Sequence, residues 1–203
     1  RSIGRLDKET SGILLFARNQ VAAARLQKQR EEGKLQKKYL ALAEGDLSEA
    51  NDSVFWKEIA IPLAPDPENS MKMTISPDGL LPGSRNAVTY YKNIKNFGNA
   101  TLVKLQLETG RTHQIRVHMA GIGHPLLGDT MYNPGTCLNM SNSKEKKNTK
   151  GRINNRNDCF KRAALHAWKL TFCHPFTDEI ITLEAPLPDD FCRFLNANEE
   201  EKT

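Results

Sequence analysis

The sequence predicts an α+β fold built on a mixed, mainly antiparallel sheet with a few flanking helices and a central cleft. Short apolar or alternating segments bounded by Gly, Asn and Pro recur along the 203 residues, which is typical of strands joined by hairpins. Only two segments carry helix signals, and no internal repeat is present. With 38% hydrophobic residues the chain can bury a substantial core, so we expect a single domain over residues 1–203.

The first elements follow from an apolar run and a capped helix. Residues 11–17 are apolar and bounded by turn residues, which predicts a buried strand. Asn19 is placed to cap a helix over residues 20–33, a segment rich in Ala, Leu, Gln and Arg that Gly33 should end. Because the chain begins with Arg1 and runs at once into a motif, we expect this domain to lack an N-terminal part.

The middle of the chain predicts strands. In residues 37–45, two sets of side chains alternate along the chain, which predicts a strand. Three prolines then favour an extended, non-helical connection: Pro62, Pro65 and Pro67. Residues 84–94 and 100–110 lie on either side of KNFGN, whose Asn and Gly suit a hairpin turn.

The last elements follow a second turn. Thr112 could cap a short helix over residues 113–120, and residues 166–172 and 179–187 resemble two further strands.

Charge is unevenly distributed. The net charge is +5, yet residues 144–162 hold eight basic and two acidic side chains, which leaves the remainder close to neutral. This part of the chain is rich in Asn and Lys, so we expect a disordered basic insertion at about residues 134–160. Net charge alone is therefore weak evidence for a nucleic-acid partner.

The cysteines and the hydropathy narrow the class of protein. Four cysteines lie far apart with no Cys-x-x-Cys pair, which argues against a zinc ribbon or a thioredoxin-like site: Cys137, Cys159, Cys173 and Cys192. A chain of this size needs no disulfides, which favours the cytoplasm. No apolar run is long enough to cross a bilayer, so we expect no membrane partner.

Two stretches carry candidate chemistry. In RLDKETSG, residues 5–12, Asp7 lies in a cluster of turn-forming residues. In GRTHQIRVHM, residues 110–119, the start of a helix would present free N–H groups to an anion, and Arg111 adds charge. Arg116 would lie beside the core-facing side of this helix. A buried Arg needs a carboxylate, and Asp7 is a candidate.

Four segments in this order resemble the RluA-type pseudouridine synthases, which isomerise uridine in folded RNA. They read RLDKETSGILLFA, KKYLAL, GRTHQIRVHMAGIGHPLLGD and ALHAWKLTFCHPFT…APLPDDF, and the resemblance runs from Arg5 to about Phe191. One departure is Gly4, because many family members carry His before the Arg of the first motif. Strands upstream of this motif, and often a small RNA-binding domain, also occur in the family.

The resemblance implies three catalytic residues. Asp7 would attack C1′ of the sugar or remove a proton from it, and the sequence does not choose between these roles. Arg116 would hold the Asp7 carboxylate ionised and aimed. Tyr39 would offer a flat face to the uracil and a hydroxyl for the late proton transfer from C5. The target base must leave its stack to reach them.

The resemblance also implies RNA contacts around this centre, which we expect from Arg5, Thr10, Arg111, Thr112, His113 and Gln114. The reaction needs no cofactor, and we expect no metal, because His113 and His118 are five residues apart and lie on different helix faces. The expected partner is ribosomal RNA rather than transfer RNA, with the chain acting as a monomer.

Other interpretations remain open. Asp7 could serve only a structural turn, Tyr39 could be a core residue, and Arg116 could belong to a structural ion pair. Arg5 could hold open the flipped base or could pair locally with Glu9. A catalytically silent RNA-binding domain on the same fold is the main alternative function. A hydrolase is less consistent, because neither a second placed acid nor a Gly-x-Ser-x-Gly motif is evident.

Overall fold

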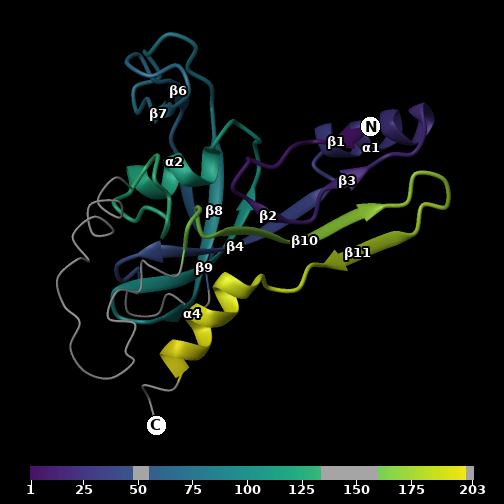
Figure 1. The fold of residues 1–203 in the computed structure, drawn as a ribbon. Coiled ribbons are helices and arrows are strands. Elements are labelled where there is room, and N and C mark those ends of the chain that lie inside the picture. Colours follow the sequence, from purple (N-terminus) through teal and green to yellow (C-terminus); the bar gives the residue numbers. More distant parts are fainter. Residues whose placement is uncertain (48–54, 134–159, 200–203) are drawn as a thin grey trace.

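The computed structural model describes residues 1–47, 55–133 and 160–199 (Figure 1). Its main sheet has seven strands within this part of the chain: β2 (Ser11–Gly12), β4 (Gln36–Glu44), β5 (Lys57–Ala60), β8 (Val88–Asn96), β9 (Ala100–Leu107), β10 (Leu165–Cys173) and β11 (Ile180–Glu184). Six of them follow the order β11-β10-β4-β9-β8-β5 with antiparallel neighbours, and β2 pairs with β10 in parallel. The predicted mixed, mainly antiparallel sheet is confirmed.

Two helices pack on opposite faces of this sheet. α2 (Gln114–Gly121) contributes Ile115 and Met119 to a core with the Tyr39 face of β4. α4 (Asp189–Glu199) contributes Phe191 and Phe194 to a second core on the other face. In Figure 1, α4 crosses the lower part of the sheet, and the β6–β7 hairpin (Leu63–Pro65 and Met73–Ile75) extends above α2. A different helix thus packs against the apolar part of each face of β4.

A third core holds the N-terminal segment against one end of β10. α1 (Gln20–Glu31) packs its Leu26 there, and the Asn19 side chain accepts a hydrogen bond from the Ala22 N–H at 2.8 Å, so the predicted cap is confirmed. Residues 11–17 are not one strand, because their two ends have different partners. Ser11–Gly12 joins β10, whereas Leu15–Phe16 (β3) pairs with Ser2–Ile3 (β1).

The start of α2 differs from the prediction. His113, not Thr112, occupies the capping position, with a left-handed backbone (φ 54°) and no side-chain capping bond. The side chain of Gln114 folds back instead, and its Oε1 accepts hydrogen bonds from the Arg111 N–H and the Thr109 hydroxyl, each at 2.9 Å. Thr112 is exposed.

The expected insertion at residues 134–160 lies outside the described residues except for Phe160, which is buried against α4. None of the helices in the described ranges is both long and apolar enough to cross a membrane.

Candidate active site

Asp7 begins a tight turn that leaves its side chain unused. The Thr10 N–H donates to the Asp7 carbonyl at 2.9 Å, which closes the turn through the backbone. The half-exposed Asp7 carboxylate makes no hydrogen bond or ion pair with any residue that the structure describes. A purely structural turn aspartate would be expected to bond its own backbone, and this one does not.

The turn is fixed by its close approach to β10. Gly12 has φ 107°, and a Cβ atom there would lie 2.2 Å from the Ala167 carbonyl oxygen, so only glycine fits. Next to it, the Ile13 N–H donates to that oxygen at 2.9 Å, and the Ser11 hydroxyl lies 2.9 Å from Nδ1 of His166. The small residues that follow Asp7 in the motif therefore hold its turn against the sheet.

Arg116 is buried on α2 and binds Asp129, a carboxylate that the sequence did not predict as its partner. Its Nε and Nη2 donate to the two oxygens of Asp129, each at 2.7 Å. The pKa of Arg116 is raised although burial opposes its charge, because the hydrogen bond and the charge of Asp129 outweigh burial. Asp129, and not the candidate Asp7, is therefore the carboxylate that pairs directly with Arg116. Asp7 acts on Arg116 only through its charge.

Asp129 is fully buried and firmly held. Its Oδ1 also accepts from the backbone N–H groups of Met131 and Tyr132, both at 3.1 Å. Gly128 precedes it with φ 70°, and a Cβ there would approach the Arg162 carbonyl oxygen to 2.3 Å. The Gly-Asp pair thus places an anchored carboxylate under Arg116, whose Nη1 has no hydrogen bond to a described residue.

Glu9 connects the Asp7 turn to α2. Its Oε2 lies 3.6 Å from Nη2 of Arg116, and the Arg162 guanidinium donates to its backbone carbonyl at 3.0 Å. Arg162 in turn pairs with Asp190 of α4 at 2.8 Å. Glu9 therefore faces Arg116 and not Arg5, which is exposed.

Tyr39 lies on the central strand β4, beside Leu105 of β9. It is 7% exposed, and its hydroxyl has no hydrogen-bond partner among the described residues. Burial, helped by the negative charge of Asp7, raises the pKa of Tyr39 to about 12. The phenol is therefore protonated at neutral pH and lies within electrostatic reach of Asp7.

Tyr132, which the sequence did not predict as a site residue, lies next to His113 and Arg116. The Tyr132 hydroxyl accepts from the Met73 N–H at 3.0 Å and lies 2.8 Å from Nδ1 of His113, to which it can donate. Burial lowers the pKa of His113, and Arg116 adds to this effect while Asp7 opposes it. The Tyr132 ring lies 5.1 Å from the Arg116 guanidinium. No local pattern marked Tyr132, which lies three residues beyond the end of the third family segment.

The other predicted contacts divide by position. Arg5 and Thr112 are exposed, and Thr10 and Arg111 are half-buried. Gln114 is 2% exposed, and its amide group is fully occupied by Thr109, Arg111, Val88 and Thr89. This placement favours an internal role for Gln114 in shaping the loop, while the other four could face a ligand.

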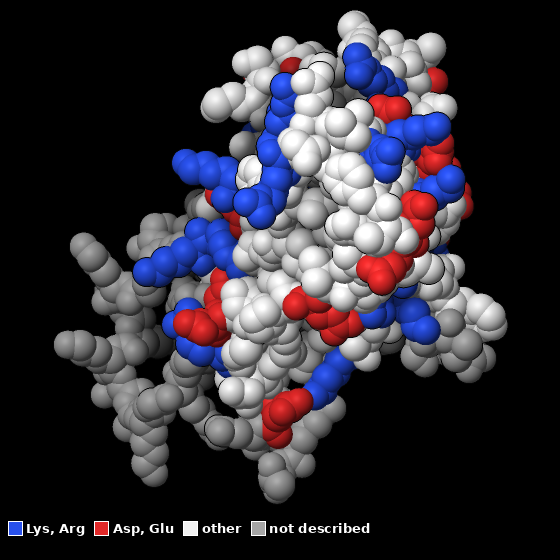
Figure 2. Space-filling view, turned by 90° about the vertical axis from the view of Figure 1, so that its right-hand side faces the viewer, with Lys and Arg blue, Asp and Glu red and all other residues white. Residues whose placement is uncertain are grey.

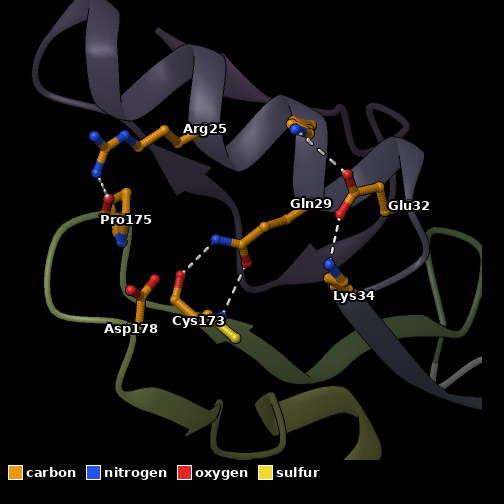
Figure 3. A pocket seen from close by; sticks show the side chains of 8 residues that line it. Arg25, Gln29, Glu32, Lys34, Cys173, Pro175 and Asp178 are labelled. Atoms are coloured by element: carbon orange, nitrogen blue, oxygen red, sulfur yellow. Dashed lines mark hydrogen bonds and ion pairs between the residues drawn. The ribbon is translucent and has the colours of Figure 1, made fainter.

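A separate cavity lies between α1 and the turn after β10 (Figure 3). Its lining residues are Arg25, Lys28, Gln29, Glu32, Lys34, Cys173, Pro175 and Asp178. There the Gln29 amide exchanges two hydrogen bonds with the Cys173 backbone, at 2.8 and 2.9 Å, and so extends the edge of the sheet. None of the predicted site residues lines this cavity. Among the described residues, no group of three or more His, Cys, Asp or Glu could hold a metal ion.

The comparisons with known proteins agree on one family. Residues 1–121 match the family model described as RNA pseudouridylate synthase. The chain is 38% identical to an uncharacterized RNA pseudouridine synthase, YhcT, of Bacillus subtilis, over 94% of this chain and 53% of that protein. It is 37% identical to ribosomal large subunit pseudouridine synthase D of Haemophilus influenzae, over 96% of this chain and 55% of that protein. The chain thus spans about half the length of these relatives.

Two solved structures have a fold similar to that of this chain. The human RNA pseudouridylate synthase domain containing 4 superposes with a TM-score of 0.71 at 26% identity, covering 98% of this chain and 75% of that one. The human domain containing 1 gives a TM-score of 0.69 at 27% identity, covering 93% and 69%. From the family match over most of its length and from this agreement in fold, we conclude that the chain belongs to the RNA pseudouridylate synthase family.

Proposed function

We propose that this chain converts uridine to pseudouridine in a structured RNA, with Asp7 as the catalytic carboxylate. The observation that carries the proposal is a carboxylate that has no structural partner among the described residues and lies close to the other candidate residues. The charge of Asp7 acts on Tyr39, His113, Arg116 and Tyr132, which come from three different parts of the chain, while its own carboxylate is unused by the described residues. A group with this placement and no structural partner is a candidate for chemistry.

The reaction breaks the N1–C1′ bond, turns the base, forms a C5–C1′ bond and removes the proton from C5. Asp7 is suited either to attack C1′ or to take a proton from the sugar. Arg116 is held by Asp129 and Glu9 at the base of the site, so its charge faces Asp7 from a fixed position. We propose that this fixed positive charge orients the Asp7 carboxylate, whose own charge acts on Arg116.

Tyr39 is assigned the late proton transfer. With a pKa of about 12 its phenol is protonated, so it can accept the C5 proton only while it passes its own proton on. The nearby Asp7 carboxylate is the acceptor that we propose. The ring of Tyr39 would at the same time support one face of the uracil.

The proposed substrate is ribosomal RNA rather than transfer RNA, and we propose action in the cytoplasm as a monomer. Support for ribosomal RNA comes from relatives at 36–37% identity that are named ribosomal large subunit pseudouridine synthase D. The alternative, a silent RNA-binding domain, is disfavoured because binding alone does not require a free Asp7 beside a buried Tyr39 and an anchored Arg116.

The test is a comparison of cells with and without the gene. Pseudouridines are mapped in total ribosomal and transfer RNA, and the deleted strain is complemented with wild type or with Asp7→Asn. The proposal predicts loss of at least one ribosomal pseudouridine that only the wild type restores. Identical maps would argue for the silent domain, and restoration by Asp7→Asn would contradict the assignment of Asp7 as the catalytic carboxylate.

A further inference from the structure

The face of the sheet opposite Tyr39 carries four lysines on four adjacent strands. Successive side chains of a strand point to opposite faces, so Lys38 lies directly behind Tyr39. Lys38 is paired with Lys169 of β10, and Lys104 of β9 is paired with Lys92 of β8. We call these four residues the lysine face.

A half-buried tryptophan organises the lysine face. The pairing of β4 with β10 shifts register between His166 and Lys169, and Trp168 lies within this irregularity. The Lys104 ammonium lies 4.8 Å and that of Lys169 lies 5.6 Å from the centre of the Trp168 ring. These cation–π contacts hold two of the positive charges in place.

Among the described residues, Lys38 and Lys104 of the lysine face have no ion-pair partner, whereas Lys169 has one. Lys169 pairs with Glu184 of β11 at 2.7 Å, and at the opposite edge Glu108 accepts a hydrogen bond from Tyr90. Burial lowers the pKa of Lys104, and its three lysine neighbours lower it further while Glu184 opposes them. At Lys104, the effect of the three neighbouring lysines thus exceeds the effect of Glu184.

The lysine face is also left uncovered by α4. This helix buries the apolar part of the same side, where Phe191 and Phe194 pack with Leu42. The lysines begin where that apolar contact ends, and they are half-exposed. By contrast, acidic and basic side chains alternate on the face that carries α1 (Figure 2).

Lysines paired across neighbouring strands repel and weaken a sheet. A polyanion removes this repulsion, and phosphates are the anions that RNA supplies in a row. A structured RNA bound at Tyr39 extends well beyond one nucleotide, and the lysine face adjoins the site through the single strand β4. We propose that the lysine face is a second RNA-contact surface, which binds phosphates of the same RNA away from the target uridine. This inference rests on the proposed function and extends its RNA contacts to the reverse side of the sheet.

The test compares two variants that each lose two positive charges. Lys38→Gln/Lys104→Gln removes two members of the lysine face. The control, Lys28→Gln/Lys34→Gln, removes two lysines that pair with Glu32 near α1. The probe is an unmodified transcript of large-subunit ribosomal RNA, and its affinity is measured at salt concentrations between about 50 and 200 mM, a range over which phosphate contacts weaken strongly.

The lysine-face variant should bind roughly tenfold more weakly at low salt, and its slope of log affinity against log salt should fall by about 1.5. The control should stay within about twofold of wild type with an unchanged slope. Lys38→Arg/Lys104→Arg should bind as wild type does. Equal losses in both double variants would show a general charge effect and overturn the proposal, as would a wild-type slope in the lysine-face variant.

Two further measurements separate a loss of RNA contacts from a loss of stability and from a loss of catalysis. Because repulsion is relieved, the melting temperature of the lysine-face variant should equal or exceed that of wild type, and Lys38→Gln alone should give about half the change in slope. Pseudouridine formation by wild type is followed separately through release of the C5 hydrogen. Absence of turnover in wild type would contradict the proposed function. The binding comparison would still show whether the lysine face contacts RNA.

Discussion

Arg116 and Asp129 form a bidentate ion pair, with both N–O distances at 2.7 Å and both side chains buried. The pair joins α2 to the loop before the undescribed segment, and Glu9 brings the Asp7 turn to the same guanidinium. The position of the Asp7 turn relative to α2 therefore depends on a carboxylate that takes no direct part in the proposed reaction.

Asp129→Asn should destabilise the protein strongly, because it leaves the buried Arg116 charge without its partner. We expect a loss of about 3–5 kcal/mol, which corresponds to a melting temperature lower by roughly 6–20 °C. Glu9→Gln is the control, since the Glu9 side chain is 34% exposed and its Oε2 lies 3.6 Å from Nη2 of Arg116. It should cost less than about 1 kcal/mol. Thermal melting of both variants checks this, and an Asp129→Asn protein as stable as wild type would contradict it.

Tyr39→Phe should separate chemistry from packing. The ring and its contacts in the core remain, while the hydroxyl is lost, so stability and RNA affinity should be near wild type. The rate of the bound complex should fall roughly 10²-fold or more. Single-turnover release of the C5 hydrogen measures it, and an unimpaired Phe variant would return Tyr39 to a purely structural role.

Gly12→Ala should both destabilise the fold and slow the reaction, because its Cβ would displace the Ala167 carbonyl and with it the Asp7 turn. Gly33→Ala is a matched control, since Gly33 also has a positive φ (70°) but has open space around it. The control should show only backbone strain of about 1 kcal/mol. Equal melting temperatures and rates for the two variants would rule out the close approach as the cause.

Stability should fall as the pH drops from 7.5 to 5.5. Burial is the first cause of the lowered pKa values of His113, His118 and His166. Between their lowered pKa values and the ordinary value of about 6.5, the unfolded chain binds protons that the folded chain does not. Their contribution is therefore present above that value and is lost below it. Urea unfolding at several pH values checks this, and a flat profile would contradict it.

Local sequence signals predicted the elements whose partners lie nearby. Asn19 caps α1 through a contact three residues away, and the β8–β9 hairpin follows from its own turn residues. The capping by Thr112 was wrong because Gln114, a residue with a longer side chain, reaches back and satisfies the loop. α4 was not predicted, because its apolar residues are recognisable as a helix face only once they pack against the sheet.

The site was predictable only in part, for a related reason. The family motifs identified Asp7, Tyr39 and Arg116 as candidates, and the structure brings their elements together. The pairing of Arg116 with Asp129 depends on a backbone turn at Gly128 that packs against the segment before β10. Residues 128 and 162 are far apart in sequence, so no local pattern could reveal that contact. The lysine face was missed likewise, because it exists only through strand register.

The most direct test of the account is Asp7→Asn. The substitution keeps the size of the side chain and removes the carboxylate, which has no structural partner among the described residues, so melting temperature and RNA affinity should change little. Release of the C5 hydrogen from labelled uridine in a ribosomal RNA transcript should fall to the background without enzyme. Measurable turnover by the Asn variant, with deamidation excluded by mass spectrometry, would contradict the central claim.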